Sequence, residues 1–457
     1  MGTHLCGAEA LLLTLLSCLA VLRPALTRPG FTNFQVLFAG WIQTTGLHAV
    51  TETLVATDVA RRRHHERFHR FYSRGSWLPD QWGRILLTVA LRVVAEAEPI
   101  RVVLDDTLAP KKGAQVFGIG SHLDAVRSSR KRRVFTFGHC WVMLAVLIPV
   151  PFSERRWALP VLFRLYRSKR TCAAQSARDQ YRKKTELGRE MLDLVIAWAG
   201  HRRIELATDS AYCNDTIAKD LPDSVVLLGA MRPDAVLTDT PPPRLGKHRG
   251  RPRKRGKSLP KPQALANDPA TPWQVLKIGL YGESRKLRFK QCVAQWYRPC
   301  GSRLLRIIIV QVEHGSLGLR VFFSTDPKMS VTAILQGYAR RWSIEVCFRD
   351  LKQYLGFADS SARTQNAVER TAPFVGYCYT LVVLWFVQFA YPSNAAVIPV
   401  RPWYLHKRGV SFADILRTAQ RVLAPFDILD PRWNLDDLKI SSFTLDLSKR
   451  SRVKCVA

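Results

Sequence analysis

The spacing of apolar and polar positions in the middle of the chain predicts several buried strands. Residues 100–107 (IRVVLDDT) form a short apolar run that ends in acids, as expected for a buried strand whose carboxyl end reaches solvent. Segments 116–122 and 133–148 predict the next two strands, and the second of these is rich in Val, Phe and Trp. Two further strands are predicted at 203–208 and 225–228.

Helical segments separate the last of these strands. Within residues 176–199, Leu187, Met191 and Val195 fall on one helical face, and Gly200 supplies a stop. A short helix is expected after residue 208. The resulting order, β-β-β-α-β-α-β, matches the RNase H-like fold, in which three strands form a meander and later strands enter through helical crossovers. We therefore predict an α/β protein with an RNase H-like core, built on a mixed five-stranded sheet with helices.

The rest of the chain is predicted to add to this core. The first 97 residues have helical patterns. Residues 232–305 become Pro-rich, then strongly basic, then strand-like, which predicts a mostly β insertion that interrupts the core. A long helix is expected over 330–355, and an amphipathic helix near 411–423.

Two apolar stretches raise the question of a membrane. Residues 11–22 resemble the apolar part of a signal peptide, but the ten residues before them carry no Lys or Arg. Residues 371–392 are uncharged and long enough to span a bilayer, yet they contain Pro373, Gly376 and Gln388. A buried core helix is the favoured interpretation of residues 371–392, and no membrane partner is expected.

The charge balance points to a polyanionic partner. The chain has 69 Lys and Arg against 36 Asp and Glu, a formal net charge of +33. Such a surface favours nucleic acid, although ribosomal, histone-like and membrane-surface proteins are also basic. The ten Cys are scattered without a CxxC pair, which is typical of reduced thiols in a cytoplasmic protein rather than of a zinc site.

Three acids stand where a phosphodiester-cleaving site would need them. Asp105 and Asp209 lie at the ends of two predicted strands, and Glu345 lies in the long predicted helix. Cleavage and transfer of phosphodiesters use two divalent ions about 3.5–4 Å apart, and Mg²⁺ or Mn²⁺ prefers carboxylate oxygens. The sequence therefore predicts that Asp105, Asp209 and Glu345 are catalytic residues that hold two such ions.

The long helix carries a second pattern around its acid. Four residues are spaced Y-x2-R-x3-E-x6-K, which puts them within an arc of roughly 60° at about 100° per residue. They are Tyr338, Arg341, Glu345 and Lys352. One face would then present a carboxylate for metal, two cations for phosphates and a Tyr that can stack. An ordinary surface helix with an Arg–Glu pair four residues apart would share part of this spacing.

Three segments carry motifs of a known family. They are LDDTLAPKKG (104–113), LATDSAY (206–212) and YARRWSIEVCFRDLKQYLG (338–356). The first two resemble the first-acid and second-acid motifs of DDE transposases from bacterial insertion sequences. The third looks like the YREK signature of the branch around insertion sequences 4 and 701, and the similarity extends over nearly the whole chain.

This resemblance implies roles for the residues that match the motifs. Asp105, Asp209 and Glu345 would be the metal ligands of an RNase H-like transposase. The residues that would contact terminal phosphates or the displaced strand are Tyr338, Arg341 and Lys352. The resemblance also implies a homodimer in the synaptic complex with DNA.

The first motif leaves one ambiguity, because Asp105 and Asp106 are adjacent. On a strand only one of two neighbouring side chains can face the metal ions. The pattern of the resembled family is D-x-T, which selects Asp105 with Thr107 two residues on. Asp106 stays the alternative.

A basic segment lies inside the predicted insertion. Residues 244–261 contain nine Lys or Arg and no acid, and their centre, RGRPRK, resembles an AT-hook. A Gly-Arg-Pro of this kind can lie in the narrow minor groove of A·T-rich DNA. A solvated loop that holds phosphates without reading sequence is an equal alternative. The candidate DNA-binding residues are Arg249, Arg251, Arg253 and Lys254.

A second basic cluster, residues 61–77, interleaves six Arg with histidines and aromatic residues. It predicts either a helix that lays Arg on DNA or a solvated basic face over buried aromatics. The histidines do not have the spacing of a four-ligand metal site. His139, in the third predicted strand, is expected to be a core histidine rather than a base.

Together these patterns predict a transposase that cuts double-stranded DNA at transposon ends and transfers the strands into target DNA. The alternatives are an RNase H-fold nuclease without strand transfer and a catalytically inactive, domesticated DNA-binding protein. The expected location is the cytoplasm, on the nucleoid. The predicted regions are a helical DNA-binding region (1–97), the first part of the core (98–231), the basic β-rich insertion (232–305), the second part of the core with the catalytic helix (306–395), and a C-terminal region with a candidate dimer contact (396–457).

Overall fold

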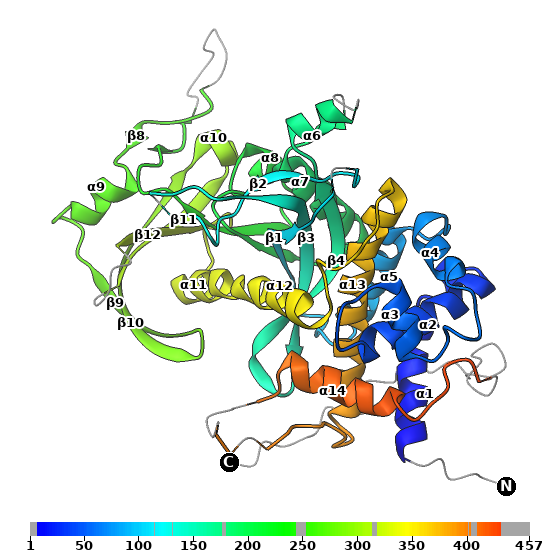
Figure 1. Ribbon diagram of the computed structural model, residues 1–457. Coiled ribbons are helices and arrows are strands. Elements are labelled where there is room, and N and C mark those ends of the chain that lie inside the picture. Colours follow the sequence, from blue (N-terminus) through cyan, green and yellow to red (C-terminus); the bar gives the residue numbers. More distant parts are fainter. Residues whose placement is uncertain are drawn as a thin grey trace.

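The computed structural model joins a group of helices to one large sheet (Figure 1). It describes residues 7–113, 115–129, 131–175, 180–243, 253–312, 318–400, 402–403 and 409–430. Helices α1 to α5, in blue, lie on one side together with α13 and α14, and the strands fill the other side (Figure 1). The α/β class predicted from the sequence is confirmed.

The first part of the chain is helical, as predicted. Its helices share an aromatic cluster in which the ring of Phe34 lies 5.0 Å from that of Trp82 and 6.3 Å from that of Phe374. Gly83 lets helix α5 touch the sheet, because a Cβ there would lie 2.1 Å from the carbonyl oxygen of Val161. The helices are α1 (Gly7–Ala20), α2 (Arg28–Gln43), α3 (Val50–Ala56), α4 (Glu66–Ser73) and α5 (Pro79–Leu91).

The centre of the sheet has the strand order β4-β3-β1-β5-β6. Strands β4, β3 and β1 form an antiparallel meander, whereas β1, β5 and β6 run parallel to one another. This mixed five-stranded arrangement is the RNase H-like core that the element order predicted. The strands are β1 (Ile100–Pro110), β3 (Phe135–Val150), β4 (Ser153–Tyr166), β5 (Ile204–Thr208) and β6 (Val225–Met231).

The third strand of the meander differs from the sequence prediction. Of the predicted strand at 116–122, only the short edge strand β2 (Gly120–Leu123) forms, and the meander is completed instead by β4. Strand β4 has a weak sequence pattern because it begins with exposed polar residues and contains Pro160. Pro160 is tolerated because it lies opposite Ala145, where the β3–β4 register shifts.

The connections between these strands are helical where the prediction placed helices. The predicted helix at 176–199 begins only at Lys184, and residues 176–179 lie outside the described residues. Helix α7 packs against β3 and β4, and Gly188 brings it close to Leu104 of β1. These helices are α6 (Lys169–Ala174), α7 (Lys184–Ala199) and α8 (Asp215–Ala218).

Beyond β6 the sheet continues with antiparallel strands. Strand β12 pairs with β6, and the order then runs β11-β10-β7-β8, with β9 paired to β10. Residues 232–305 therefore contribute strands to the same sheet as the core. The elements here are β7 (Leu237–Thr238), β8 (Ser258–Leu259), α9 (Pro262–Asn267), β9 (Gln274–Leu280), β10 (Glu283–Gln295), α10 (Tyr297–Cys300), β11 (Leu304–Val312) and β12 (Leu319–Ser324).

The single long helix predicted over 330–355 is wrong, because the structure contains two helices there. Helix α11 (Val331–Ala339) and helix α12 (Trp342–Tyr354) lie end to end (Figure 1, yellow). At the junction the amide of Arg341 donates to the carbonyl of Tyr338, and the amide of Ile344 donates to that of Arg341, both at 3.0 Å. These bonds span three residues rather than four, so the turn tightens where the two helices meet.

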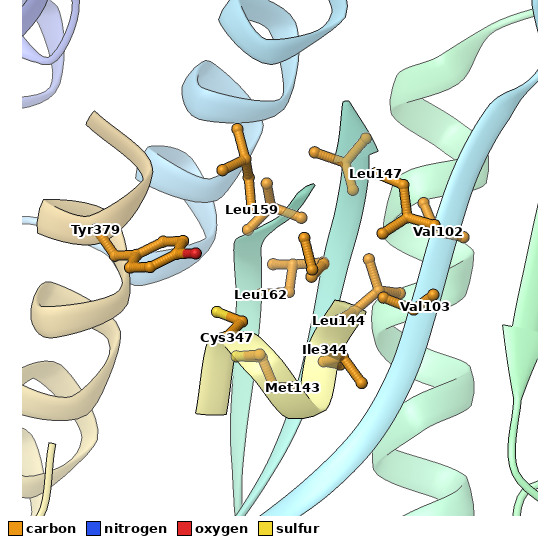
Figure 2. Packing of buried hydrophobic residues seen from close by; sticks show 14 of the residues in the cluster. Val102, Val103, Met143, Leu144, Leu147, Leu159, Leu162, Ile344, Cys347 and Tyr379 are labelled. Carbon is orange, nitrogen blue, oxygen red and sulfur yellow. The ribbon is translucent and has the colours of Figure 1, made fainter. Parts of the chain in front are cut away.

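The uncharged run at 371–392 is a buried core helix, as predicted. Helix α13 (Gln365–Trp385) continues as a π-helix (Phe386–Ala390), and 89% of its most apolar window is buried inside the fold. Figure 2 shows Tyr379 of α13 next to Cys347 of α12, over Met143 of β3. The predicted C-terminal helix is α14 (Phe412–Leu423), and all eight cysteines within the described residues are free.

Candidate active site

Asp105 and Asp209 lie side by side where the paired parts of two neighbouring strands end. The predicted end of the first strand at residue 107 is wrong, because β1 continues to Pro110 and Asp105 lies within it. Strands β1 and β5 are parallel, and Leu104 is paired with Thr208. Asp105 follows the first of these residues and Asp209 the second, so the register brings the two acids together. The backbone amides of Ala211 and Tyr212 donate to Oδ1 of Asp209, at 3.0 and 3.3 Å, which fixes that carboxylate.

The environment of these two carboxylates disfavours their charged forms. Burial, with a further contribution from the charge of Asp209, raises the pKa of Asp105 to about 7. Burial also raises the pKa of Asp209, although the backbone amides and Arg341 oppose the shift. Two buried carboxylates that repel each other are a place where bound positive charge would be stabilised.

Glu345 reaches the same place from the first turn of α12, through Arg341. Nη1 of Arg341 donates to Oδ2 of Asp105, and Nη2 donates to Oε1 of Glu345, both at 2.8 Å. The guanidinium is largely buried, with 15% of the side chain exposed, and its Nε has no partner. Within the described part of the chain, no three Asp, Glu, His or Cys side chains lie close enough to hold one ion. Arg341 thus bridges two of the three predicted acids.

Asp106 points to the opposite side of β1 from Asp105, because neighbouring side chains on a strand alternate. Its Oδ2 accepts from Nζ of Lys184 at 2.6 Å and from Sγ of Cys140 at 3.4 Å. Its Oδ1 accepts from the hydroxyl of Tyr212 at 2.9 Å. Asp106 is therefore already paired on the face that α7 covers, which supports Asp105 as the acid that faces Asp209.

The remaining members of the Y-x2-R-x3-E-x6-K pattern lie on either side of Arg341. The ring of Tyr338 packs against that of Phe322 at 4.8 Å, and the guanidinium of Arg341 lies 5.8 Å from the Tyr338 ring. The side chain of Lys352 is exposed, two turns beyond Glu345. Desolvation nevertheless lowers the pKa of Lys352, and the carboxylate of Asp124 opposes this shift.

The other candidate residues include some that the structure describes and some that it does not. Arg249 and Arg251 are outside the described residues, whereas Arg253 and Lys254 are exposed. In the cluster at 61–77 the large aromatic side chains are buried and most arginines are exposed. This arrangement is compatible both with a helix that lays Arg on DNA and with a solvated basic face over buried aromatics. His139 is a core histidine, as expected, because it is buried and its Nε2 lies 2.9 Å from the carbonyl oxygen of Phe117.

Two residues around the acids are missing from the sequence prediction. Tyr212 holds Asp209 with its amide and Asp106 with its hydroxyl, so it links β1 to the end of β5. It belongs to the quoted LATDSAY segment, which is a signal that could have identified it. Lys184 has no such signal, since it is 78 residues from Asp106 and meets it only through the packing of α7.

The chain is similar to known protein families and structures. The family described as "DDE superfamily endonuclease" matches residues 22–298, and the family described as "Archaeal putative transposase ISC1217" matches residues 301–396. Similar solved structures include the cryo-EM structure of the piggyBac transposase synaptic complex with hairpin DNA. It is 11% identical, with a TM-score of 0.42, over 91% of this chain and 74% of that chain. No curated protein matches the sequence.

Proposed function

The chain belongs to the DDE superfamily endonuclease family, and from this premise we propose that it is a transposase that cuts DNA at transposon ends and joins them to target DNA. One observation carries the proposal. Asp105 of β1 and Asp209, which follows β5, lie next to each other, and Arg341 connects Glu345 of α12 to Asp105. A protein that only binds DNA would gain nothing from carboxylates that face the negatively charged phosphates.

These carboxylates suit divalent metal ions. Mg²⁺ and Mn²⁺ are hard ions that prefer carboxylate oxygens. The raised pKa of Asp105 supports this assignment, because burial and the charge of Asp209 both make a nearby cation favourable. Asp105, Asp209 and Glu345 would hold two such ions. When bound, the ions supply Lewis acidity to the attacking and leaving oxygens of the phosphodiester.

Arg341 occupies part of the proposed metal site. Its guanidinium pairs with both Asp105 and Glu345, so metal ions at these carboxylates would compete with Arg341 for them. A released guanidinium can then pair with a DNA phosphate, which is the role that the YREK resemblance implies for it. Arg341 would therefore exchange an internal acid for a DNA phosphate as the site is assembled.

The DNA partner follows from the charge. A net charge of +33 favours a polyanion, and the exposed Lys352 lies two helical turns from Glu345, about 10.5 Å along the axis at 1.5 Å per residue. That distance suits a phosphate next to the one being cut. We further propose the insertion-sequence 4/701 branch as the finer family, a homodimer on double-stranded DNA ends, and a cytoplasmic location on the nucleoid.

Removal of divalent ions tests this function. Purified protein is expected to cut a DNA fragment that carries its transposon ends only with Mg²⁺ or Mn²⁺. Ca²⁺ should support binding with little cutting, because its looser coordination positions the reacting oxygens poorly. Gel assays of cleavage and binding on the same fragment give both results. Full cleavage in excess EDTA would exclude the proposed mechanism.

A further inference from the structure

A β-hairpin extends beyond the acids at the same end of the sheet. Its two strands are β2 and the beginning of β3, with Leu123 opposite Phe135 and Ser121 opposite Phe137. Strand β3 then runs on to Met143, which is opposite Asp105. At about 3.3 Å per residue, Phe137 and Phe135 lie roughly 20 and 26 Å beyond Asp105 along the strand.

The hairpin carries an exposed apolar row. Leu123, Phe135 and Phe137 are 51%, 61% and 47% exposed, although large apolar side chains are normally buried. Side chains opposite each other on paired strands project from the same face, and residues two apart on one strand do so as well. These three side chains therefore share one face of the hairpin. By the same alternation along β3, this is the face of Met143 and Asp105.

Hydrogen bonds tie together the two ends of the turn that joins these strands. Oδ1 of Asp124 accepts from the backbone amides of Val126 and Arg127 at 3.1 Å, and its Oδ2 accepts from Oγ1 of Thr136 at 3.0 Å. The amide of Val134 donates to Oγ of Ser128 at 2.9 Å. Hydrogen bonds across the turn thus hold Leu123 and Phe135 in place while their side chains face solvent.

Four cations lie in the turn at the end of this apolar row. Arg127, Lys131, Arg132 and Arg133 are all exposed. Arg127 lies 3.8 Å from Asp124, and within the described residues no acid pairs with the other three. A row of apolar side chains next to exposed cations matches the minor-groove wedges of DNA-bending proteins, whose cations hold the adjacent phosphates.

We propose that this hairpin is a second contact site for double-stranded DNA. Leu123, Phe135 and Phe137 enter the minor groove and kink the duplex, while the cations of the turn hold adjacent phosphates. At about 3.4 Å per base pair, the contact falls roughly six to eight base pairs from the phosphate at Asp105. This inference rests on the proposed function. A second copy of the chain suits the surface less well, because it would bring four cations against another chain of charge +33.

The experiment measures DNA bending and binding with a duplex that carries a transposon end and a fluorophore at each terminus. Wild-type protein should raise energy transfer between the fluorophores. F135S/F137S should lose that increase while affinity falls by about tenfold. Replacing Lys131, Arg132 and Arg133 by Gln should lower the salt slope of binding by about 2 to 3. V55S, which changes an apolar residue of α3 that is 63% exposed, is the matched control and should behave as wild type.

The outcomes separate the hairpin from the proposed function. Bending that survives in F135S/F137S would overturn the inference. A change from dimer to monomer in DNA-free F135S/F137S, with bending intact, would identify a second copy as the occupant and also overturn it. Bending that depends on Phe135 and Phe137 in a wild-type protein that never cuts would support the hairpin and contradict the proposed function. Absence of DNA binding would contradict both.

Discussion

An Asp105→Asn protein is expected to lose DNA cleavage by more than about a thousandfold, while its DNA binding stays close to wild type. Asp105 lies beside Asp209 and would hold metal, which contributes several kcal/mol at the reacting phosphate, and each 1.36 kcal/mol is a factor of about ten in rate. Binding depends on cations elsewhere on the surface, so it should persist. Single-turnover cleavage and a binding titration on the same DNA fragment measure the two effects.

Asp106→Asn is the matched control, because it makes the same chemical change one residue away. Asp106 pairs with Lys184 and Tyr212 on the other side of β1, so its loss should leave cleavage within about a hundredfold of wild type. The melting temperature should fall, since Lys184 loses its acid. If Asp106→Asn abolished cleavage and Asp105→Asn cut normally, the assignment of the first acid would be wrong.

Arg341→Ala is expected to change the metal requirement, whereas Lys352→Ala is not. Arg341 competes with a metal ion for Asp105 and Glu345, so its removal should tighten binding of Mn²⁺ to the DNA-free protein. Each charge-assisted contact contributes about 1.5–3 kcal/mol, which corresponds to roughly ten- to a hundredfold in affinity. Calorimetry of Mn²⁺ binding to the DNA-free protein measures this change in affinity directly, without a cleavage assay.

Lys352→Ala should weaken the complex with a DNA end by a similar factor and leave Mn²⁺ affinity unchanged, because Lys352 is two turns from Glu345. Arg341→Ala should also cleave more slowly, since the phosphate contact is lost. Equal Mn²⁺ affinity in wild type and Arg341→Ala would show that the bridge to the acids does not oppose metal binding. Rescue of Lys352→Ala by excess Mg²⁺ would place Lys352 in the metal site instead.

The core of the fold was predictable because its strands have strong local patterns. The segment 100–107 shows an apolar run followed by acids, and 203–208 repeats the pattern, so the positions of Asp105 and Asp209 directly after these runs follow from the sequence, although β1 itself continues to Pro110. Strand β4 could not be predicted in the same way. Pro160 and the exposed residues at its beginning hide a strand that is specified by pairing with β3, a long-range interaction.

The bridge that Arg341 makes between Asp105 and Glu345 is the other feature that local sequence patterns do not contain. A continuous helix from 330 to 355 would place Arg341 and Glu345 on one surface, and their contact does occur. The helix is interrupted at Arg341, however, and the second arm of its guanidinium reaches Asp105, 236 residues away. Such a contact arises only when α12 packs over β1, so neither spacing nor motif reveals it.

Joining of a pre-cut end tests most directly whether the acids of this chain join DNA as well as cut it. A transposon end with a free 3′ hydroxyl is incubated with a supercoiled plasmid, Mg²⁺ and the purified protein. We expect covalently joined products with the wild-type protein and none with Glu345→Gln, although both proteins bind the end. Joined products from Glu345→Gln, or cutting without joining by the wild-type protein, would contradict the account.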